Sequence, residues 1–264
     1  MNNIFIYSGG FYELIKLINL IIKNDYEVAN IYNKETYQIT LFDNLIELDL
    51  EGEDYINFLN KFSYRVKRIC FYIFLSNDSM KDLTIYYFLR NALIYHDKVF
   101  YLRNLNCVNK AYELSCYVRR ETHKFKGFMR FKKMKGNFYY AEFSPTNNII
   151  FLVAQHFKRR LSSEYFIIKD VKRNIYACFN KKNILFFYEE SNIRKNFVDD
   201  DEELFRQELW KSFFKTIGIN ERKNKKVQIN FMPKKYWKYI IEMEDEKWRK
   251  LFLVMNLRKR KKTQ

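Results

Sequence analysis

The sequence lacks the residue spacings that mark metal and redox sites. Its four cysteines contain no CxxC pair, and its three histidines do not complete a zinc pattern with them. The cysteines are Cys70, Cys107, Cys116 and Cys178. We therefore expect reduced, mostly buried thiols of the kind found in cytoplasmic proteins, with no metal site and no cofactor in this chain.

Long apolar runs are absent as well. No stretch reaches the roughly 20 apolar residues that a bilayer-spanning helix needs. The N-terminus, residues 1–5, has no basic region followed by an apolar run, so we expect no signal peptide. No amphipathic pattern offers a clean apolar face to a membrane surface. These absences predict a soluble protein without a membrane partner.

Glycine and proline are scarce, with 6 and 2 residues respectively. The turn Ser8-Gly9-Gly10 separates a strand-like run at 4–7 from a helical pattern at 11–23, a shape that can cradle a phosphate at a helix N-terminus. The turn has no GxGxxG pattern and no following Lys-Ser or Lys-Thr pair. We therefore interpret it as a structural turn.

Positive charge is present in excess and is distributed unevenly. The 264 residues include 48 Lys and Arg against 31 Asp and Glu, a formal net charge of +17. Residues 1–118 hold 12 Lys and Arg against 14 Asp and Glu, whereas residues 119–264 hold 36 against 17. A/T-rich codons explain part of the Lys content, but codon bias acts along the whole gene and does not separate the halves. A localised positive field attracts polyanions, so nucleic acid is the expected partner.

Alternating helical and strand-like patterns predict an α+β fold of mixed helices and short, mostly antiparallel strands, with no transmembrane segment. Helices are expected over 53–75, 79–95 and 106–124. A hairpin is expected from strands at 127–131 and 138–143 around Lys135-Gly136-Asn137. Charge divides the chain into a near-neutral α/β part, a basic α+β part and a basic tail, unless these form one continuous domain. Their ranges are 1–118, 119–242 and 243–264.

Basic side chains alternate with aromatic ones in strings beyond residue 118. The strings lie at 119–131, 155–160, 169–173 and 220–239. Cations can bind phosphates while rings stack on bases, so the pattern suits a nucleic-acid surface; a solvated face over buried Phe residues is the alternative. The residues expected to contact nucleic acid are Arg119, Arg120, Lys126, Arg130, Arg159, Arg160, Lys172, Arg173, Arg222, Lys223, Lys234, Lys235, Tyr236 and Trp237.

Glu121, His123, His156 and Asp170 are the candidate catalytic residues. His156 has the side chain of a general base or a phosphate donor, and Asp170 lies among cations. The four residues would build an acid/base or metal-binding site only if the fold brings them together. The alternative is a structural histidine and an ion-paired scaffold carboxylate.

Several ordered strings resemble a known family. They include ETHKFKGFMRF at 121–131, QHFKRR at 155–160, IKDVKR at 168–173 and FMPKKYW at 231–237. These strings resemble a bacterial family of unknown function whose members are labelled DNA metabolism proteins. The resemblance extends to about residue 242 and departs from the family at Gly9-Gly10, where the usual turn has an acidic residue before glycine.

The resemblance implies a biological context more than an activity. Members of the family occur alone or fused to a uracil-DNA-glycosylase-like domain, and they are paired with a DNA-repair radical-SAM protein. This chain has no room for the glycosylase domain, no glycosylase motif and no cysteine triad for an iron–sulfur cluster, so it resembles the stand-alone form. The family has no catalytic residues that can be carried over to this sequence.

Three functional hypotheses follow from the sequence and from the resemblance, which alone implies the partners. The first is a nucleic-acid-binding accessory protein in DNA repair or DNA modification, which binds DNA or RNA and acts with a radical-SAM or glycosylase-like partner. The second is an enzyme acting on DNA, glycosylase-like or nuclease-like, with a His/Glu/Asp site. The third is a protein-interaction subunit whose basic face docks an acidic partner.

Overall fold

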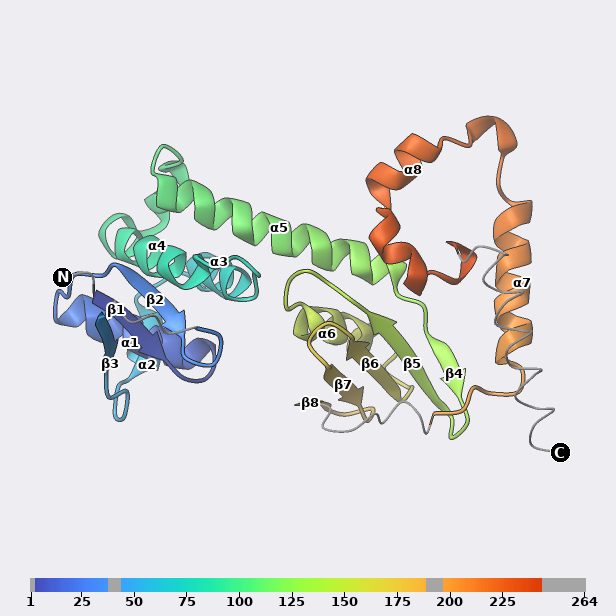
Figure 1. Cartoon of the computed structure of the whole chain (residues 1–264), viewed down its shortest axis with the longest axis horizontal. Helices are drawn as coiled ribbons and strands as arrows, with labels where there is room; N and C mark the ends of the chain where they lie inside the picture. Colours follow the sequence, from blue (N-terminus) through green and yellow to red (C-terminus); the bar gives the residue numbers. More distant parts are fainter. Residues whose placement is uncertain (1–2, 38–43, 189–196, 244–264) are drawn as a thin grey trace. The chain divides into compact units, whose positions relative to one another are not determined.

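The computed structural model describes residues 3–37, 44–188 and 197–243 (Figure 1). Helices and two β-sheets make this an α+β fold, as predicted. The chain folds as two compact units. Unit 1 is Met1–Glu121 with Thr146–Asn148, and unit 2 is Thr122–Pro145 with Ile149–Gln264. None of the helices within the described ranges is long and apolar enough to span a membrane.

Unit 1 contains a three-stranded sheet in the order β2-β1-β3, in which both strand pairs are parallel. Its strands are β1 (Asn3–Tyr7), β2 (Asn30–Asn33) and β3 (Asn44–Glu47). Parallel neighbours need a crossover connection, and helix α1 (Phe11–Lys23) supplies the one between β1 and β2. The strand and the helix expected on either side of the Gly9-Gly10 turn are confirmed.

Helix α1 shows how the sequence forms the core of unit 1. Its apolar residues recur at helical spacing, and Leu14, Ile18 and Ile21 are fully buried. Glu13 accepts a hydrogen bond from the Gly10 N–H at 3.1 Å, which closes the first turn of the helix. Local periodicity and a local cap therefore agree on where this helix begins.

Further helices complete unit 1. They are α2 (Tyr55–Asn60), α3 (Tyr64–Phe74), α4 (Lys81–Tyr95) and the 3-10 helix η1 (His96–Tyr101). The single helix predicted over 53–75 is wrong, because Ser63 begins a second helix by accepting the Val66 N–H at 3.4 Å. Asp54 caps α2 in the same way. The helix predicted over 79–95 is confirmed as α4.

Helix α5 (Asn106–Phe128) is longer than predicted, and the boundary between the units falls within it. The strand predicted at 127–131 is wrong, since its first two residues are helical and strand β4 (Lys132–Met134) begins later. The cause is packing: the Phe125 ring is buried edge-on against the rings of Phe143 and Tyr236, with both centroid distances 4.9 Å.

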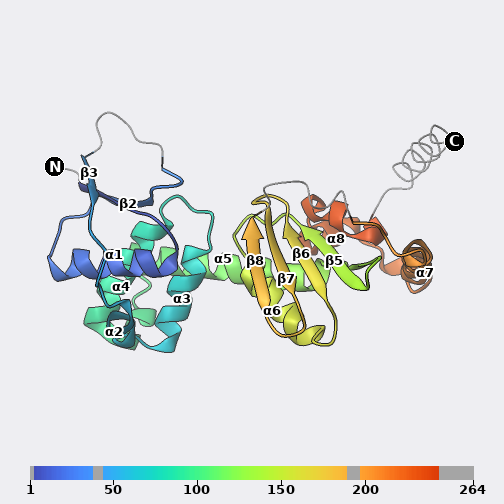
Figure 2. The same ribbon diagram turned by 90° about the horizontal axis from the view of Figure 1, so that it is seen from below.

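Unit 2 contains a five-stranded sheet in the order β4-β5-β6-β7-β8. The other strands are β5 (Phe138–Phe143), β6 (Phe166–Asp170), β7 (Ile175–Phe179) and β8 (Ile184–Tyr188). Only the β5–β6 pair is parallel, because helix α6 (Ile150–Arg160) forms the crossover between them; the remaining pairs are antiparallel. α6 packs against β6, β7 and β8 (Figure 2). The predicted turn before β5 is confirmed, with positive φ angles of 97° at Gly136 and 58° at Asn137.

The remainder of unit 2 consists of short elements after the sheet. They are α7 (Glu203–Thr216), η3 (Asn220–Arg222), α8 (Lys225–Phe231), η4 (Lys234–Tyr239) and η5 (Ile241–Met243). Of the tail predicted at 243–264, all but the first residue lies outside the described residues. In the described part, unit 2 therefore ends at η5, which packs against α7.

Candidate nucleic-acid interface

The end of α5 and helix α6, both in unit 2, bring four of the predicted site residues together. Lys126 lies in the last turn of α5, and His156, Arg159 and Arg160 lie in the last two turns of α6. The charges of Lys126, Arg160 and Arg159 all act on the His156 imidazole. We call these four residues the cationic cluster.

The surroundings of the histidine in the cationic cluster disfavour its protonated form. Burial lowers the pKa of His156, and the neighbouring charges of Lys126, Arg160 and Arg159 lower it further. The imidazole lies edge-on to the ring of Phe157, with the centroids 5.1 Å apart. A bound anion would offset the three cations, so it would raise the pKa of His156 again.

The three cations of the cluster are open to an anionic ligand. Arg159 and Arg160 are exposed and Lys126 is half-buried. Within the described ranges, no ion pair joins any of the three to an Asp or Glu side chain. The C-terminal end of a helix favours nearby positive charge, which explains why α6 tolerates Arg159 and Arg160 together.

Arg130 and Arg173 do not fit the predicted role in phosphate contact. The Arg130 guanidinium binds Glu242 through two hydrogen bonds, one of them 3.2 Å from Nε to Oε2. The Arg173 guanidinium lies 3.0 Å from Asp170. Their side chains are only 24% and 18% exposed. Both are structural cations, because a buried carboxylate already satisfies each of them.

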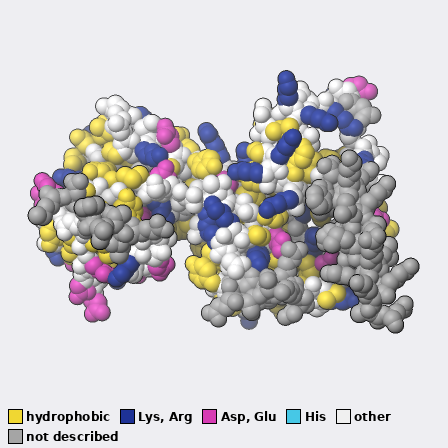
Figure 3. Space-filling view, in the orientation of Figure 1, with side chains coloured by type: hydrophobic (Ala, Val, Ile, Leu, Met, Phe, Trp, Pro, Cys, Tyr) yellow, Lys and Arg dark blue, Asp and Glu magenta, His cyan; other side chains and the backbone are white. Residues whose placement is uncertain are grey.

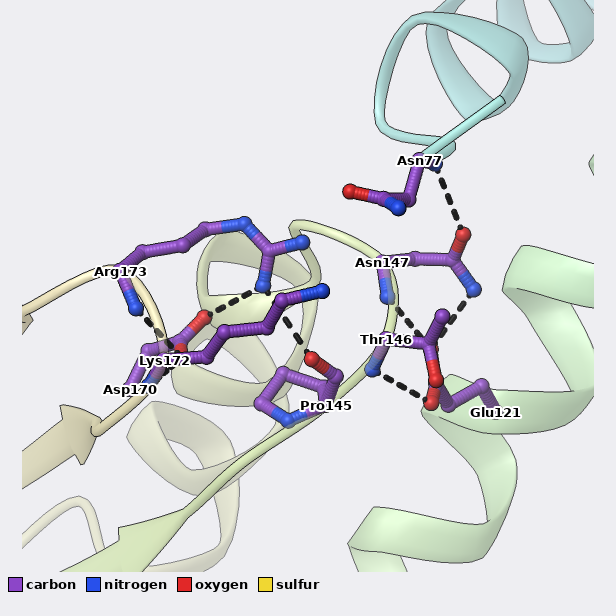
Figure 4. A network of polar contacts seen from close by, with 8 residues as sticks. All are labelled: Asn77, Glu121, Pro145, Thr146, Asn147, Asp170, Lys172 and Arg173. Atoms are coloured by element: carbon purple, nitrogen blue, oxygen red, sulfur yellow. Dashed lines mark hydrogen bonds and ion pairs between the residues drawn. The ribbon is translucent and has the colours of Figure 1, made fainter. Parts of the chain in front are cut away.

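Asp170 organises the turn that follows β6 (Figure 4). Its Oδ1 accepts hydrogen bonds from the backbone N–H groups of Lys172 and Arg173, at 3.0 and 3.3 Å. Arg173 also donates to the carbonyl oxygen of Pro145 at 3.3 Å. Burial raises the pKa of Asp170, while Arg173 and the two N–H groups oppose the shift. These contacts give Asp170 a scaffold role and leave Lys172 exposed beside it.

Glu121 has a similar structural role in unit 1 (Figure 4). Its carboxylate accepts the backbone N–H groups of Thr146 and Asn147, both at 2.8 Å, and the Asn147 side-chain amide at 2.6 Å. Asn147 in turn accepts the Asn77 N–H at 3.1 Å. Glu121 is 4% exposed, so it fastens residues 146–148 to α5.

No contact among the described residues assembles the four predicted catalytic side chains. Glu121 belongs to unit 1, whereas His123, His156 and Asp170 belong to unit 2. Among the described residues, no hydrogen bond or ion pair joins His123, His156 and Asp170 to one another. No group of three or more His, Cys, Asp or Glu side chains in that part of the chain could hold a metal ion. His123 is an exposed residue of α5.

The other predicted contact residues divide into exposed cations and packed rings. The exposed cations are Arg119 and Arg120 in unit 1, and Lys172, Arg222, Lys223, Lys234 and Lys235 in unit 2. Tyr236 is 4% exposed and packs against Phe125 and Phe128, so the prediction that it stacks on bases is wrong. Trp237 is half-buried, and its Nε1 donates to the Met232 carbonyl oxygen at 2.8 Å.

Comparison with known families places this chain in a wider group of proteins. Residues 79–242 match the family described as a domain of unknown function, DUF4130. The chain belongs to the DUF4130 family. The match includes the whole cationic cluster, as well as Glu121 and Asp170. No curated protein and no solved structure matches the chain.

The described part of unit 2, most of which lies in the DUF4130 match, is strongly basic. It holds 24 Lys and Arg against 11 Asp and Glu. In the space-filling view, Lys and Arg side chains gather around α8 and the C-terminal end of α5 (Figure 3). The acidic side chains of unit 2 are instead concentrated at 199–208, at the start of α7. A large part of the positive charge therefore lacks acidic neighbours in the sequence.

Two polar contacts with consequences for stability or binding were missed by the sequence analysis. In unit 1 the Tyr7 hydroxyl donates to buried Asp82 at 3.2 Å. In the DUF4130 region, Trp210 Nε1 donates to Glu242 Oε2 at 3.1 Å. Neither pair has a sequence signal, because the partners are 75 and 32 residues apart.

Proposed function

We propose that this chain is a DNA-binding accessory protein that presents DNA to a repair or modification enzyme. The observation that carries the proposal is the cationic cluster, in which two helices bring Lys126, Arg159 and Arg160 together without a carboxylate partner in the described residues. Such a cluster gains free energy from phosphates, because binding releases the counterions of the nucleic acid.

The sequence resemblance supports the choice of DNA and of the partner. The similar family is labelled for DNA metabolism and is paired with a radical-SAM protein of DNA repair or carries a glycosylase-like domain. An accessory role agrees with the scaffold contacts of Glu121 and Asp170, since both carboxylates already accept several hydrogen bonds. Two of the four candidate catalytic side chains, Glu121 and Asp170, therefore have structural roles.

The salt dependence of binding tests this proposal. The affinity for a labelled DNA duplex would be measured by fluorescence anisotropy between about 50 mM and about 200 mM salt. A protein with several phosphate contacts loses affinity steeply over this range, by about tenfold or more. An affinity that hardly changes with salt would contradict the proposal. Co-purification with an acidic protein after nuclease treatment would favour a protein-docking role instead.

A second candidate function is general-base catalysis on a nucleic acid by His156. The lowered pKa of His156 favours it, because a general base must be unprotonated before it accepts a proton. This function predicts strand cleavage or base release that is lost in His156→Gln and kept in Arg68→Gln, a variant of an exposed unit 1 residue. Equal activity in both variants would remove His156 from the mechanism.

A further inference from the structure

A cleft of about 600 Å³ opens in unit 2 between the end of α5, strands β4 and β5, α7 and η5. This volume lies within the range typical of small-ligand sites. The residues that matter for its chemistry are Gly127, Arg130, Phe131, Tyr139, Gln207 and Trp210. The cleft combines aromatic rings with a few polar groups.

The two guanidinium groups of this cleft are already paired, in contrast to the cations of the cationic cluster. Arg130 is held by Glu242, and Arg206 is held by Asp200 at 3.2 Å and by Glu202 at 2.6 Å. The buried carboxylate of Glu203 accepts the Lys133 backbone N–H at 2.9 Å. Lys133 also lines the cleft, and its charge acts on the Asp200 carboxylate. These cations therefore have acidic neighbours, which suits the cleft to a neutral ligand better than to a phosphate group.

Trp210 offers a fixed aromatic face in the cleft. Its Nε1 is anchored to Glu242 at 3.1 Å, and the Arg130 guanidinium lies 5.8 Å from its ring centroid. The residue is still 42% exposed. Gln207 donates its Nε2 to Glu203 at 2.9 Å, so its carbonyl oxygen can accept an N–H from a ligand. A flat ring with N–H donors fits these two side chains.

Gly127 keeps one wall of the cleft open. It lies in the last turn of α5, where alanine would favour the helix more, and a Cβ atom placed there would meet nothing within 4 Å. Its neighbour Lys126 belongs to the cationic cluster. On the other wall, the Phe131 ring contacts the Phe157 ring at 4.8 Å, next to His156. The cleft and the cluster therefore share the end of α5, and one ring contact joins a wall of the cleft to α6.

We propose that the cleft takes one unpaired nucleobase, which stacks on Trp210 while the flanking phosphates lie on the cationic cluster. The inference rests on the proposed DNA binding and deepens it by naming the preferred substrate: DNA with an extrahelical or single-stranded base. Each base that stacks on an exposed aromatic ring raises the affinity for DNA several-fold, with little dependence on sequence.

The test compares three labelled duplexes in an anisotropy assay at one salt concentration: a continuous duplex, one with a single bulged base, and one with an abasic bulge. The protein is expected to bind the bulged base about tenfold more tightly than the other two. Gly127→Leu, which fills the cleft, and Trp210→Leu, which removes the ring, should lose this preference and keep their affinity for the continuous duplex. Gly127→Ala and Trp210→Phe are the matched controls that should retain it.

Each outcome bears on a separate part of the proposal. If all three duplexes bind equally and with a steep salt dependence, the proposal of a base-binding cleft is wrong, while the proposed DNA binding still holds. The proposal of a base-binding cleft is also wrong if the preference for the bulged base survives in both Gly127→Leu and Trp210→Leu. The same holds if the abasic bulge is bound as tightly as the bulged base. Absence of salt-dependent binding to any duplex overturns both proposals together.

Discussion

The paired cations of unit 1 differ from the cations of the cluster in unit 2. In unit 1, Lys34 and Lys110 each lie 2.8 Å from a carboxylate, that of Glu47 and that of Asp78 respectively. In unit 2, Arg130 and Arg173 are paired in the same manner, but the cations of the cluster are not. A basic net charge by itself therefore does not locate a binding surface, because a paired cation has little attraction left for an added anion. Several unpaired cations gathered in one place, as in the cluster, indicate such a surface better.

The first test of this comparison destabilises unit 1 alone. Leu17 is fully buried in its core, so Leu17→Ala should lower the free energy of unfolding by about 2–5 kcal/mol. DNA affinity of the folded protein should stay unchanged, since the cluster lies in unit 2. Thermal unfolding and anisotropy would measure the two effects. Ile94→Ala, at a residue that is 64% exposed, is the control and should change neither. A parallel fall in affinity would show that unit 1 shares in binding.

The next test removes the cluster. The triple variant Lys126→Gln, Arg159→Gln and Arg160→Gln should bind duplex DNA about 100-fold more weakly at low salt, because several phosphate contacts are lost. A triple variant of exposed unit 1 cations, Lys61→Gln, Arg68→Gln and Lys98→Gln, removes the same charge and should bind almost as well as the original protein. Equal losses in the two variants would mean that net charge, and not its placement, sets the affinity.

A third prediction concerns the buried carboxylate of unit 1. Burial raises the pKa of Asp82 to about 6, while Lys81 and the Tyr7 hydroxyl oppose the shift. The folded protein then binds more protons than the unfolded chain, so stability should fall as pH rises from about 4 to about 6, by about 2–3 kcal/mol. Asp82→Asn should remove this part of the pH dependence. Denaturant unfolding at several pH values measures it, and an unchanged profile in the variant would exclude Asp82 as its source.

The smallest predicted effect comes from His156. Phosphates at the cluster would raise its lowered pKa, so binding should take up a proton and DNA affinity should increase about threefold as pH falls through the range in which His156 titrates. His156→Gln should bind with an affinity that is independent of pH in this range. Calorimetry in buffers of different ionisation enthalpy would detect the proton. Uptake that persists in the variant would assign it to another group.

Local patterns in the sequence were enough to predict much of the fold. The helical spacing of α1 and the turn at Gly136 and Asn137 depend on neighbours in the chain, and both were predicted correctly. The error at 127–131 has a distant cause, because Tyr236, far along the chain, packs on the end of α5 and extends it. Sequence patterns do not contain such contacts.

The candidate site was predicted less completely than the fold. Arg130 resembled its basic neighbours in the sequence, but its carboxylate partner Glu242 is 112 residues away. The same distance effect hid the cluster, since only the folded chain brings Lys126 near enough to His156 for its charge to act there. Which cations are paired and which are open is a property of the folded chain. Composition can give only their number.

Lysine footprinting would test most directly where DNA lies on this protein. The protein would be acetylated with and without a duplex, and modification of each lysine would be measured by mass spectrometry. We predict that DNA protects Lys126 together with exposed lysines of unit 2 such as Lys172 and Lys234, and leaves Lys61 and Lys98 of unit 1 as reactive as before. Protection of the unit 1 lysines, or equal reactivity of all of them with DNA present, would contradict a DNA-binding surface on unit 2.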